Sequence, residues 1–202
     1  TLKLYPNYIE AFGERGKIYS LIGNNKEAVD DLTVYLKAQP DSVEFLNFRG
    51  TAYSALAEDE LKYEENRDKA AANAQKAETD FNRILTIAPG ESRALNNRGR
   101  IFLLFGLYDD AIADLEKAIS ISPNFHTAYG NLALAKFYSG KGTGLTEINK
   151  AIELYGKYGE SYYIRGLIYR ADGEYQKAIA DFDRAIKEND LPEYYNARAM
   201  TR

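Results

Sequence analysis

The 202-residue sequence contains no cysteine and no tryptophan, and it has a single histidine. Without cysteine the chain can form no disulfide and no thiolate site, so the redox compartment stays undetermined. One histidine, with no second residue set at metal-ligand spacing, leaves little for acid–base or metal chemistry. We therefore expect a protein that is not an enzyme, with no catalytic residues, no metal and no cofactor.

Positive charge and long apolar runs are also missing. The net charge is −4 and the pI is about 5.2, which argues against a nucleic-acid partner, because phosphate binding needs a basic surface. No apolar run approaches the roughly 20 residues that span a bilayer, so we expect a soluble chain without membrane insertion. Neither a signal sequence nor an initiator methionine is present, and both ends read as cut within repeats. The localisation is therefore unknown.

What the sequence does contain is a periodic pattern of Arg-Gly dipeptides and prolines. The dipeptide Arg-Gly recurs with intervals of 34, 49 and 67 residues between its glycines, and three successive proline intervals are 34, 49 and 34. Two residue types that share one period and one interruption predict a helical repeat array, in which each unit buries its apolar face against its neighbours. The positions are Arg15-Gly16, Arg49-Gly50, Arg98-Gly99 and Arg165-Gly166, with Pro6, Pro40, Pro89 and Pro123.

Each unit resembles the tetratricopeptide repeat (TPR), which consists of a first helix, A, and a second helix, B. Helix A has aromatic, Leu-Gly and Tyr positions, and helix B has Ala, Phe and Ala positions before a proline. The best matches are Leu95, Gly99, Phe102, Ala111, Leu115, Ala118 and Pro123, and then Tyr162, Gly166, Tyr169, Ala178, Phe182 and Ala185. The resemblance implies an all-α fold, a right-handed α-α superhelix of about five helix-turn-helix repeats. We expect the helix A glycines to allow close approach of helix B, with its alanines opposite.

The expected boundaries follow this period. Residues 1–8 would close a preceding repeat, and residues 192–202 would open a further helix. Complete repeats are expected at 9–42, 43–91, 92–125, 126–158 and 159–191, with a helical spur near 57–75 in the second and a glycine-rich irregularity in the fourth.

The two irregular repeats have separate causes. Residues 51–88 contain neither Gly nor Pro, so the 15 extra residues predict two lengthened helices with a turn near Glu65-Asn66, where Asn66 would cap the second helix. In the fourth repeat Gly144 takes the place of the helix B alanine. Residues 139–144 fit a phosphate loop poorly, because position 135 is Ala and no strand precedes them.

A ladder of ion pairs is predicted from two further repeating positions. An arginine precedes the helix A glycine, and an acid precedes the main packing residue of helix B. The planar guanidinium suits bidentate pairing with these carboxylates at the helix contacts. The fourth repeat has Leu132 in place of the arginine. The expected participants are Arg15, Arg49, Arg98, Arg165 and Arg198 with Asp31, Asp80, Asp114, Glu147 and Asp181.

The family resemblance also implies where a partner would bind, on the inner helix A face. Spacings of three and four keep each set of residues on one side of its helix. Asn side chains there offer a donor and an acceptor to a peptide backbone, and two arginines would favour an acidic group on the ligand. The candidate partner-binding residues are Lys17, Asn47, Thr51, Arg93, Asn96, Arg100, Phe137, Tyr163, Arg170 and Asn196.

Some members of the family hold chaperone C-termini with a clamp of Lys and Asn. Here Gly13 stands where the first clamp lysine would be, so we do not expect that function. The expected function is a non-catalytic protein–protein interaction scaffold that binds a peptide or helix of a partner protein. Two alternatives stay open, a self-assembly module of unknown oligomeric state and the regulatory arm of a larger enzyme.

Overall fold

The computed structural model describes residues 6–202, and within them the regular structure is entirely helical. The all-α, TPR-like helical class predicted from the sequence is confirmed. Residues 1–5 lie outside the described part, and with them most of the predicted remnant of a preceding repeat. The described residues form two compact units, divided between Leu104 and Phe105. This division falls inside the predicted repeat 92–125, between its two helices.

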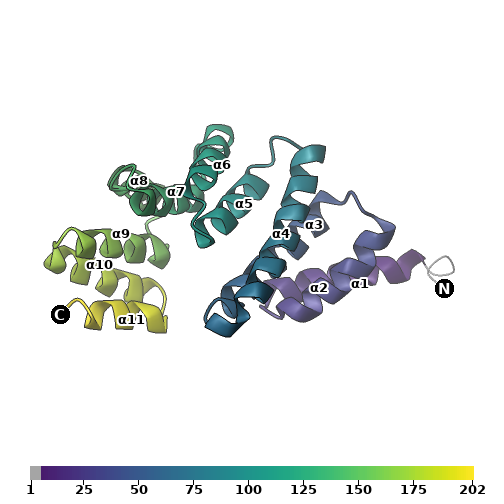
Figure 1. Ribbon diagram of the computed structural model, residues 1–202, viewed down its shortest axis with the longest axis horizontal. Coiled ribbons are helices and arrows are strands. Elements are labelled where there is room, and N and C mark those ends of the chain that lie inside the picture. Colours follow the sequence, from purple (N-terminus) through teal and green to yellow (C-terminus); the bar gives the residue numbers. More distant parts are fainter. Residues whose placement is uncertain (1–5) are drawn as a thin grey trace. The chain divides into compact units, whose positions relative to one another are not determined.

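The first unit is a succession of antiparallel helix pairs. Helix α1 packs on α2 and α3, α3 packs most extensively on α4, and α4 contacts α5 (Figure 1). Its elements are α1 (Pro6–Leu21), α2 (Asn25–Ala38), α3 (Val43–Glu60), the short 3-10 helix η2 (Glu64–Asn66), α4 (Arg67–Ile87) and α5 (Ser92–Leu104).

The second unit is built in the same way. Helices α6 and α8 flank α7, α9 pairs with α10, and α11 packs against α10. Its elements are α6 (Tyr108–Ile121), α7 (His126–Ser139), α8 (Leu145–Leu154), α9 (Gly159–Ala171), α10 (Tyr175–Glu188) and α11 (Pro192–Ala199).

Helix A glycines lie where helix A and helix B of a repeat come into close contact. A Cβ placed on Gly50 would lie 2.8 Å from the Phe81 ring, and one on Gly166 would lie 2.6 Å from the Phe182 ring. The predicted close approach is therefore present. Its partners are large helix B side chains, and the alanines that we expected opposite the glycines are not their nearest neighbours. Because an added methyl would force these rings to move, the packing explains why the helices tolerate glycine.

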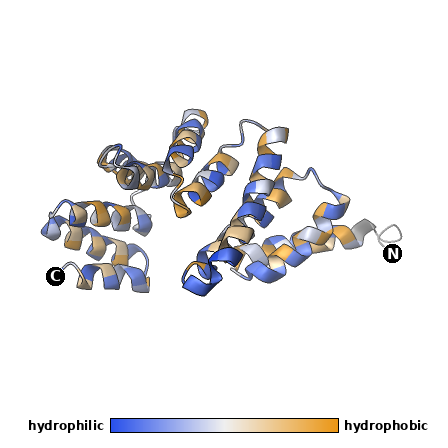
Figure 2. Ribbon diagram, in the orientation of Figure 1, coloured by the Kyte–Doolittle hydropathy of each residue, from blue (hydrophilic) through white to orange (hydrophobic). Residues whose placement is uncertain are grey.

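The core combines small and large side chains on each helix B. Ala28 and Leu32 on α2, like Ala178 and Phe182 on α10, are completely shielded from solvent. Figure 2 shows hydrophobic and hydrophilic residues alternating along the helices, as expected where one face is buried and the other is exposed. Burial of each large side chain contributes about 2 kcal/mol.

The long second repeat has a compact turn at its tip. Helix α3 has 18 residues and α4 has 21, and the turn between them includes Glu65 and Asn66, near the predicted position. Asn66 occupies the N-cap of α4 but makes no capping bond to a backbone N–H. Instead the Lys69 ammonium donates to the Asn66 Oδ1 at 3.0 Å. The predicted side-chain cap is therefore wrong.

Two left-handed glycines fix the turn of the fourth repeat. Gly140 ends α7 with φ 70°, and Gly144 precedes α8 with φ 74°. A Cβ on Gly144 would lie 2.3 Å from the carbonyl oxygen of Ala133. Both its backbone conformation and its neighbours require glycine at this position.

Candidate functional site

The predicted arginine–carboxylate ladder is present at three repeats. Arg15 donates from Nε and Nη2 to both carboxylate oxygens of Asp31, at 2.6 and 2.8 Å. Arg49 holds Asp80 in the same way at 2.9 and 2.7 Å, and Arg165 holds Asp181 at 2.7 Å through both nitrogens. Each pair joins helix A to helix B of one repeat, which confirms the prediction for these three pairs.

The ladder arginines make a second bond that sequence reasoning missed. The Nη1 of Arg49 donates to Thr33 at 3.3 Å, that of Arg98 to Asn82 at 2.6 Å, and that of Arg165 to Asn149 at 2.8 Å. In each case the acceptor lies 16 residues earlier, on helix B of the preceding repeat. Each arginine therefore links successive repeats, and the constant spacing was the signal that could have revealed it.

An aromatic ring supports several of these guanidinium groups. The Arg15 guanidinium lies 5.3 Å from the Phe12 ring centre, that of Arg165 lies 5.7 Å from Tyr162, and that of Arg198 lies 5.4 Å from Tyr195. In all three cases the ring is three residues before the arginine, on the same helix face. At Arg165, cation–π attraction thus adds a third interaction to the hydrogen bonds with Asp181 and Asn149.

The fourth repeat replaces the arginine by a lysine on the next turn. Leu132 is buried, and the Lys136 ammonium lies 2.9 Å from Glu147 and 3.3 Å from Glu116. Hydrogen bonding to Glu147 raises the pKa of Lys136 above its ordinary value. Lys136 therefore makes both connections, to its own helix B and to the preceding one.

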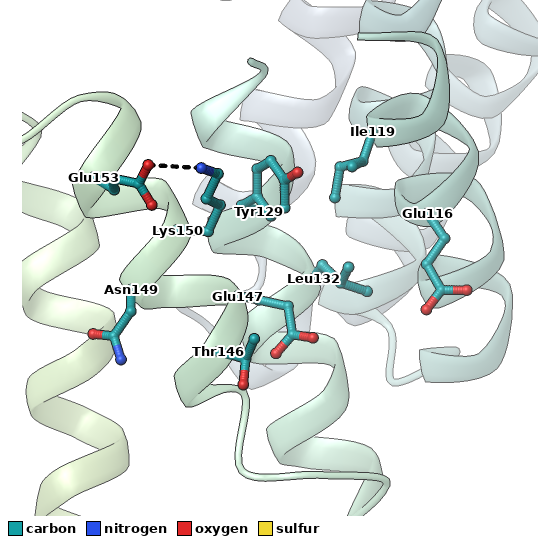
Figure 3. Close-up of a pocket in the computed structure, with 9 residues that line it drawn as sticks. All are labelled: Glu116, Ile119, Tyr129, Leu132, Thr146, Glu147, Asn149, Lys150 and Glu153. Carbon is teal, nitrogen blue, oxygen red and sulfur yellow. Dashed lines mark hydrogen bonds and ion pairs between the residues drawn. The ribbon is translucent and has the colours of Figure 1, made fainter. Parts of the chain in front are cut away.

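A hollow of about 670 Å³ opens beside this replacement, between α6, α7 and α8 (Figure 3). Its lining mixes acidic and apolar side chains and includes Leu132, the residue at the ladder position. The lining residues are Glu116, Ile119, Tyr129, Leu132, Thr146, Glu147, Asn149, Lys150 and Glu153.

Three of the predicted partner-binding residues line a hollow of about 480 Å³ in the first unit. They are Lys17 on α1, Asn47 on α3 and Arg93 on α5, joined by Val43, Glu44, Phe48 and Glu91. Lys17 donates to Glu44 at 2.5 Å and lies 5.6 Å from the Phe48 ring. The Arg93 side chain is 69% exposed and its Nε donates to Glu91 at 3.2 Å.

A short chain of amides continues from this hollow. The Asn97 amide donates to the Oδ1 of Asn47 at 3.2 Å and lies 3.5 Å from the Thr51 hydroxyl. Asn96 is only 6% exposed and donates to the Oδ1 of Asn97 at 3.1 Å. The half-buried Asn97, which sequence reasoning passed over, is thus the residue of α5 that meets Asn47 and Thr51.

Arg100 is engaged elsewhere in the same unit. Its guanidinium pairs with Glu58 near the end of α3, at 2.5 Å. The contact ties α5 to the long helix of the second repeat, and Arg100 is not among the residues that line the hollow.

The predicted residues of the second unit do not all project outward. Tyr163 packs on Phe182 and lies 5.0 Å from Tyr194, and burial raises its pKa. Phe137 is half-buried against a core cluster that includes Ile148. Arg170 is half-buried and Asn196 is exposed. The two aromatic residues are therefore packing residues as well as candidates for binding.

The single histidine, His126, starts α7 and is half-buried. Its ring lies 5.0 Å from that of Tyr155 and 5.2 Å from that of Tyr158. Burial lowers the pKa of His126 below its ordinary value of 6.5.

Two negative findings apply to the described residues. Within 6–202, no three side chains of the His, Asp or Glu type are grouped so that they could hold a metal ion. None of the helices in that range combines the length and the hydropathy needed to cross a bilayer.

Comparison with known proteins agrees with the repeat pattern. Residues 92–125 and 159–190 match the family model of the tetratricopeptide repeat. A DnaJ homolog subfamily C member 3 homolog from Dictyostelium discoideum is 26% identical over 174 residues, which cover 81% of this chain and 33% of that protein. The heat-shock protein cognate co-chaperone sgt12 of Aspergillus fumigatus is 33% identical over 110 residues, covering 54% of this chain and 32% of that protein.

Solved structures show the same architecture. A tetratricopeptide repeat protein from Parabacteroides merdae superposes with a TM-score of 0.76 at 24% identity, covering 96% of this chain and 70% of that one. Repeats of this type form helical scaffolds with extended binding surfaces. The chain contains tetratricopeptide repeats at residues 92–125 and 159–190, and it spans about a third of the length of these two curated relatives.

Proposed function

We propose that this chain is a non-catalytic scaffold that captures an extended peptide of a partner protein in the hollow between α1, α3 and the start of α5. One observation carries the proposal. Side chains from three separate helices, Lys17, Asn47 and Arg93, converge on one cavity of about 480 Å³. Convergent polar groups around a partly apolar hollow are typical of binding sites.

The polar groups suit a peptide backbone. Asn47 and Asn97 each carry an amide with a donor and an acceptor, and their mutual bond at 3.2 Å orients both side chains. A peptide that follows α3 would exchange hydrogen bonds with these amides and place an apolar side chain on Phe48. Asn residues that are already held in place lose less conformational entropy when the ligand binds.

The charged groups favour a ligand that carries a carboxylate. Lys17 and Arg93 are the cations of the hollow, and each is paired with a glutamate of the hollow itself. Arg93 is the more exposed of the two and has the longer ion pair, so a ligand carboxylate can replace Glu91 at a small cost. We assign Arg100 a supporting role, because Glu58 already holds it.

A clamp for chaperone C-termini is not part of the proposal, although one relative is a co-chaperone. Gly13, at the position of the first clamp lysine, is buried, and a Cβ there would lie 2.7 Å from the Tyr35 ring. A lysine at this position would have to displace Tyr35 and Phe45 before it could reach a ligand.

Selection from a random peptide library tests the proposal. A displayed library of 12-residue peptides would be selected on the purified chain, and the best peptide measured by fluorescence anisotropy. Asn47→Ala and Arg93→Glu should each weaken binding about tenfold, as expected for loss of a hydrogen bond to a charged or oriented group. Lys177→Glu, on an exposed face of α10, is the charge-matched control and should bind normally.

Equal affinity of all four proteins for every selected peptide would contradict the proposal. Light scattering over a range of concentrations addresses the self-assembly alternative, since only self-assembly raises the mass of the chain without a ligand.

A further inference from the structure

The hollow between α6, α7 and α8 is the place where the arginine ladder lacks one member (Figure 3). Leu132 stands at the ladder position, 16 residues after Glu116, which is the separation between Asn149 and Arg165 and between Asn82 and Arg98. Arg165 fills the space between α8 and α10, where it bonds to Asn149 and Asp181. At Leu132 the shorter side chain leaves the corresponding space open.

The groups that would bind an arginine here are nevertheless in place. Arg165 shows what a complete ladder position contains: an acid of its own helix B, an acceptor on the preceding helix B, and a ring three residues earlier. Around Leu132 the corresponding residues are Glu147, Glu116 and Tyr129, and all three line the hollow. The cavity therefore retains the kinds of residue that surround a ladder arginine, although Leu132 supplies no guanidinium.

Lys136 satisfies these acids incompletely. Its ammonium reaches Glu147 at 2.9 Å and Glu116 only at 3.3 Å, and the Glu116 side chain remains 54% exposed. A compact ammonium also cannot offer the flat fork of donors that matches two carboxylate oxygens. Part of the acceptor capacity of both glutamates thus stays available to a ligand.

The charge balance of the lining favours a cation. Three glutamates line the hollow and face two lysines: Lys150, which Glu153 holds at 2.8 Å, and Lys136, which Glu147 and Glu116 share. In Figure 3 the pair of Lys150 and Glu153 lies at one side, while Tyr129, Leu132 and Ile119 form an apolar wall. The alkyl part of an arginine would pack on that wall, and its head would meet Glu147 and Glu116.

We propose that this hollow binds an arginine side chain presented by a partner protein, which takes the place of the missing ladder arginine. The guanidinium would lie against the Tyr129 ring and donate to Glu147 and Glu116. The occupant is arginine and not lysine, because the other repeats place arginine in this arrangement and its planar fork matches it. The site does not use the hollow of α1, α3 and α5, so either proposal can fail without the other.

Nuclear magnetic resonance titration of the ¹⁵N-labelled chain tests the proposal. The ligand is the acetylated and amidated peptide Gly-Ser-Arg-Ser-Gly, and the two reference ligands carry lysine or uncharged citrulline in place of the arginine. The arginine peptide should cause saturable shifts at the amides of Tyr129, Leu132 and Glu147. Its affinity should exceed that of either reference peptide at least fivefold.

Substitutions then locate the ligand. Leu132→Arg should supply the missing group from within the chain and lower the affinity at least tenfold, whereas the uncharged control Leu132→Met should bind normally. Glu116→Gln changes an exposed position and should weaken binding about threefold. It therefore tests the site even if Leu132→Arg perturbs the fold.

Three results would overturn the proposal. One is the absence of saturable shifts at these amides, and another is equal binding of the arginine and citrulline or lysine peptides. The third is unchanged affinity of the Glu116→Gln protein. A concentration-dependent rise in mass that Leu132→Arg abolishes would place the arginine on a second copy of this chain and would rule out a separate partner.

Discussion

Lys136 bonds to Glu147 at 2.9 Å from a position one helical turn beyond Leu132, the residue that interrupts the arginine ladder. The carboxylate of Glu147 is 17% exposed, so leaving it without a cation would be costly. A lysine four residues further along the same helix face reaches it, because side chains at this spacing share that face. The fourth repeat thus keeps an ion pair between its two helices, although Leu132 leaves no arginine at the ladder position.

The first prediction concerns this pair. Lys136→Ala should lower the free energy of unfolding by about 1 kcal/mol, since two glutamates lose their shared cation and Glu147 is largely buried. Lys150→Ala, which breaks an exposed pair with Glu153, should change it by less than about 0.5 kcal/mol. Urea unfolding followed by circular dichroism measures both, and equal losses would contradict the assigned role of Lys136.

The second prediction compares two members of the ladder. Arg49→Leu leaves Asp80 without its cation, although the Asp80 side chain is only 4% exposed. The substitution should therefore lower the free energy of unfolding by about 3 kcal/mol. Arg15→Leu should cost clearly less, because Arg15 is 57% exposed and water can replace it. In the double variant Arg49→Leu, Asp80→Asn, part of the loss should be recovered, since no buried charge then remains. A larger effect at Arg15 than at Arg49 in urea unfolding would be inconsistent with burial as the cause.

Two glycines of the fourth repeat provide the third prediction. Gly144→Ala should destabilise the chain by about 2 kcal/mol or more, because φ is +74° and the new Cβ would collide with the Ala133 carbonyl. Gly142→Ala is the matched control, since nothing lies within 4 Å of a Cβ there, and it should change stability by less than about 0.5 kcal/mol. Thermal unfolding of both variants is the measurement. Similar melting temperatures for the two would show that the turn does not require glycine at 144.

The fourth prediction is a pH dependence. Burial beside Tyr155 and Tyr158 lowers the pKa of His126 below 6.5, so the folded state resists protonation that the unfolded state accepts. The stability that neutral His126 contributes is therefore present above pH 6.5 and is lost as the pH falls through the lowered value. Between pH 7.5 and 5.0 the native chain should lose more unfolding free energy than His126→Phe. Parallel changes in the two proteins would exclude His126 as the source.

The ladder shows how far a periodic sequence can predict a contact. Arg15, Arg49 and Arg165 pair with the acids that the spacing assigned to them, because a repeated helix hairpin places equivalent residues in equivalent positions. The bonds of Arg49, Arg98 and Arg165 to the preceding repeat were missed, since their acceptors differ in type. Asn82 and Asn149 are amides, whereas Thr33 is a hydroxyl.

The candidate site was harder to predict than the ladder. The family resemblance implied that Asn96 lies on the binding face, yet the structure buries Asn96 and turns Asn97 toward Asn47. Tyr163 was expected to face a ligand, but its ring also packs on Phe182. A helix rotates 100° per residue, so a small change in how one helix rests on the next moves a neighbouring residue onto the exposed face.

The sequence by itself determined the helical repeat fold, the close glycine contacts and the arginine–acid pairing at three repeats, because these depend on a pattern that returns about every 34 residues. Only the tertiary structure decided which side chains share a cavity, which of two adjacent asparagines meets Asn47, and that Lys136 replaces the arginine absent at Leu132. The physical reason is that a cavity depends on the side-chain volumes of several helices at once. A period fixes the backbone positions but not how those volumes fill the space between them.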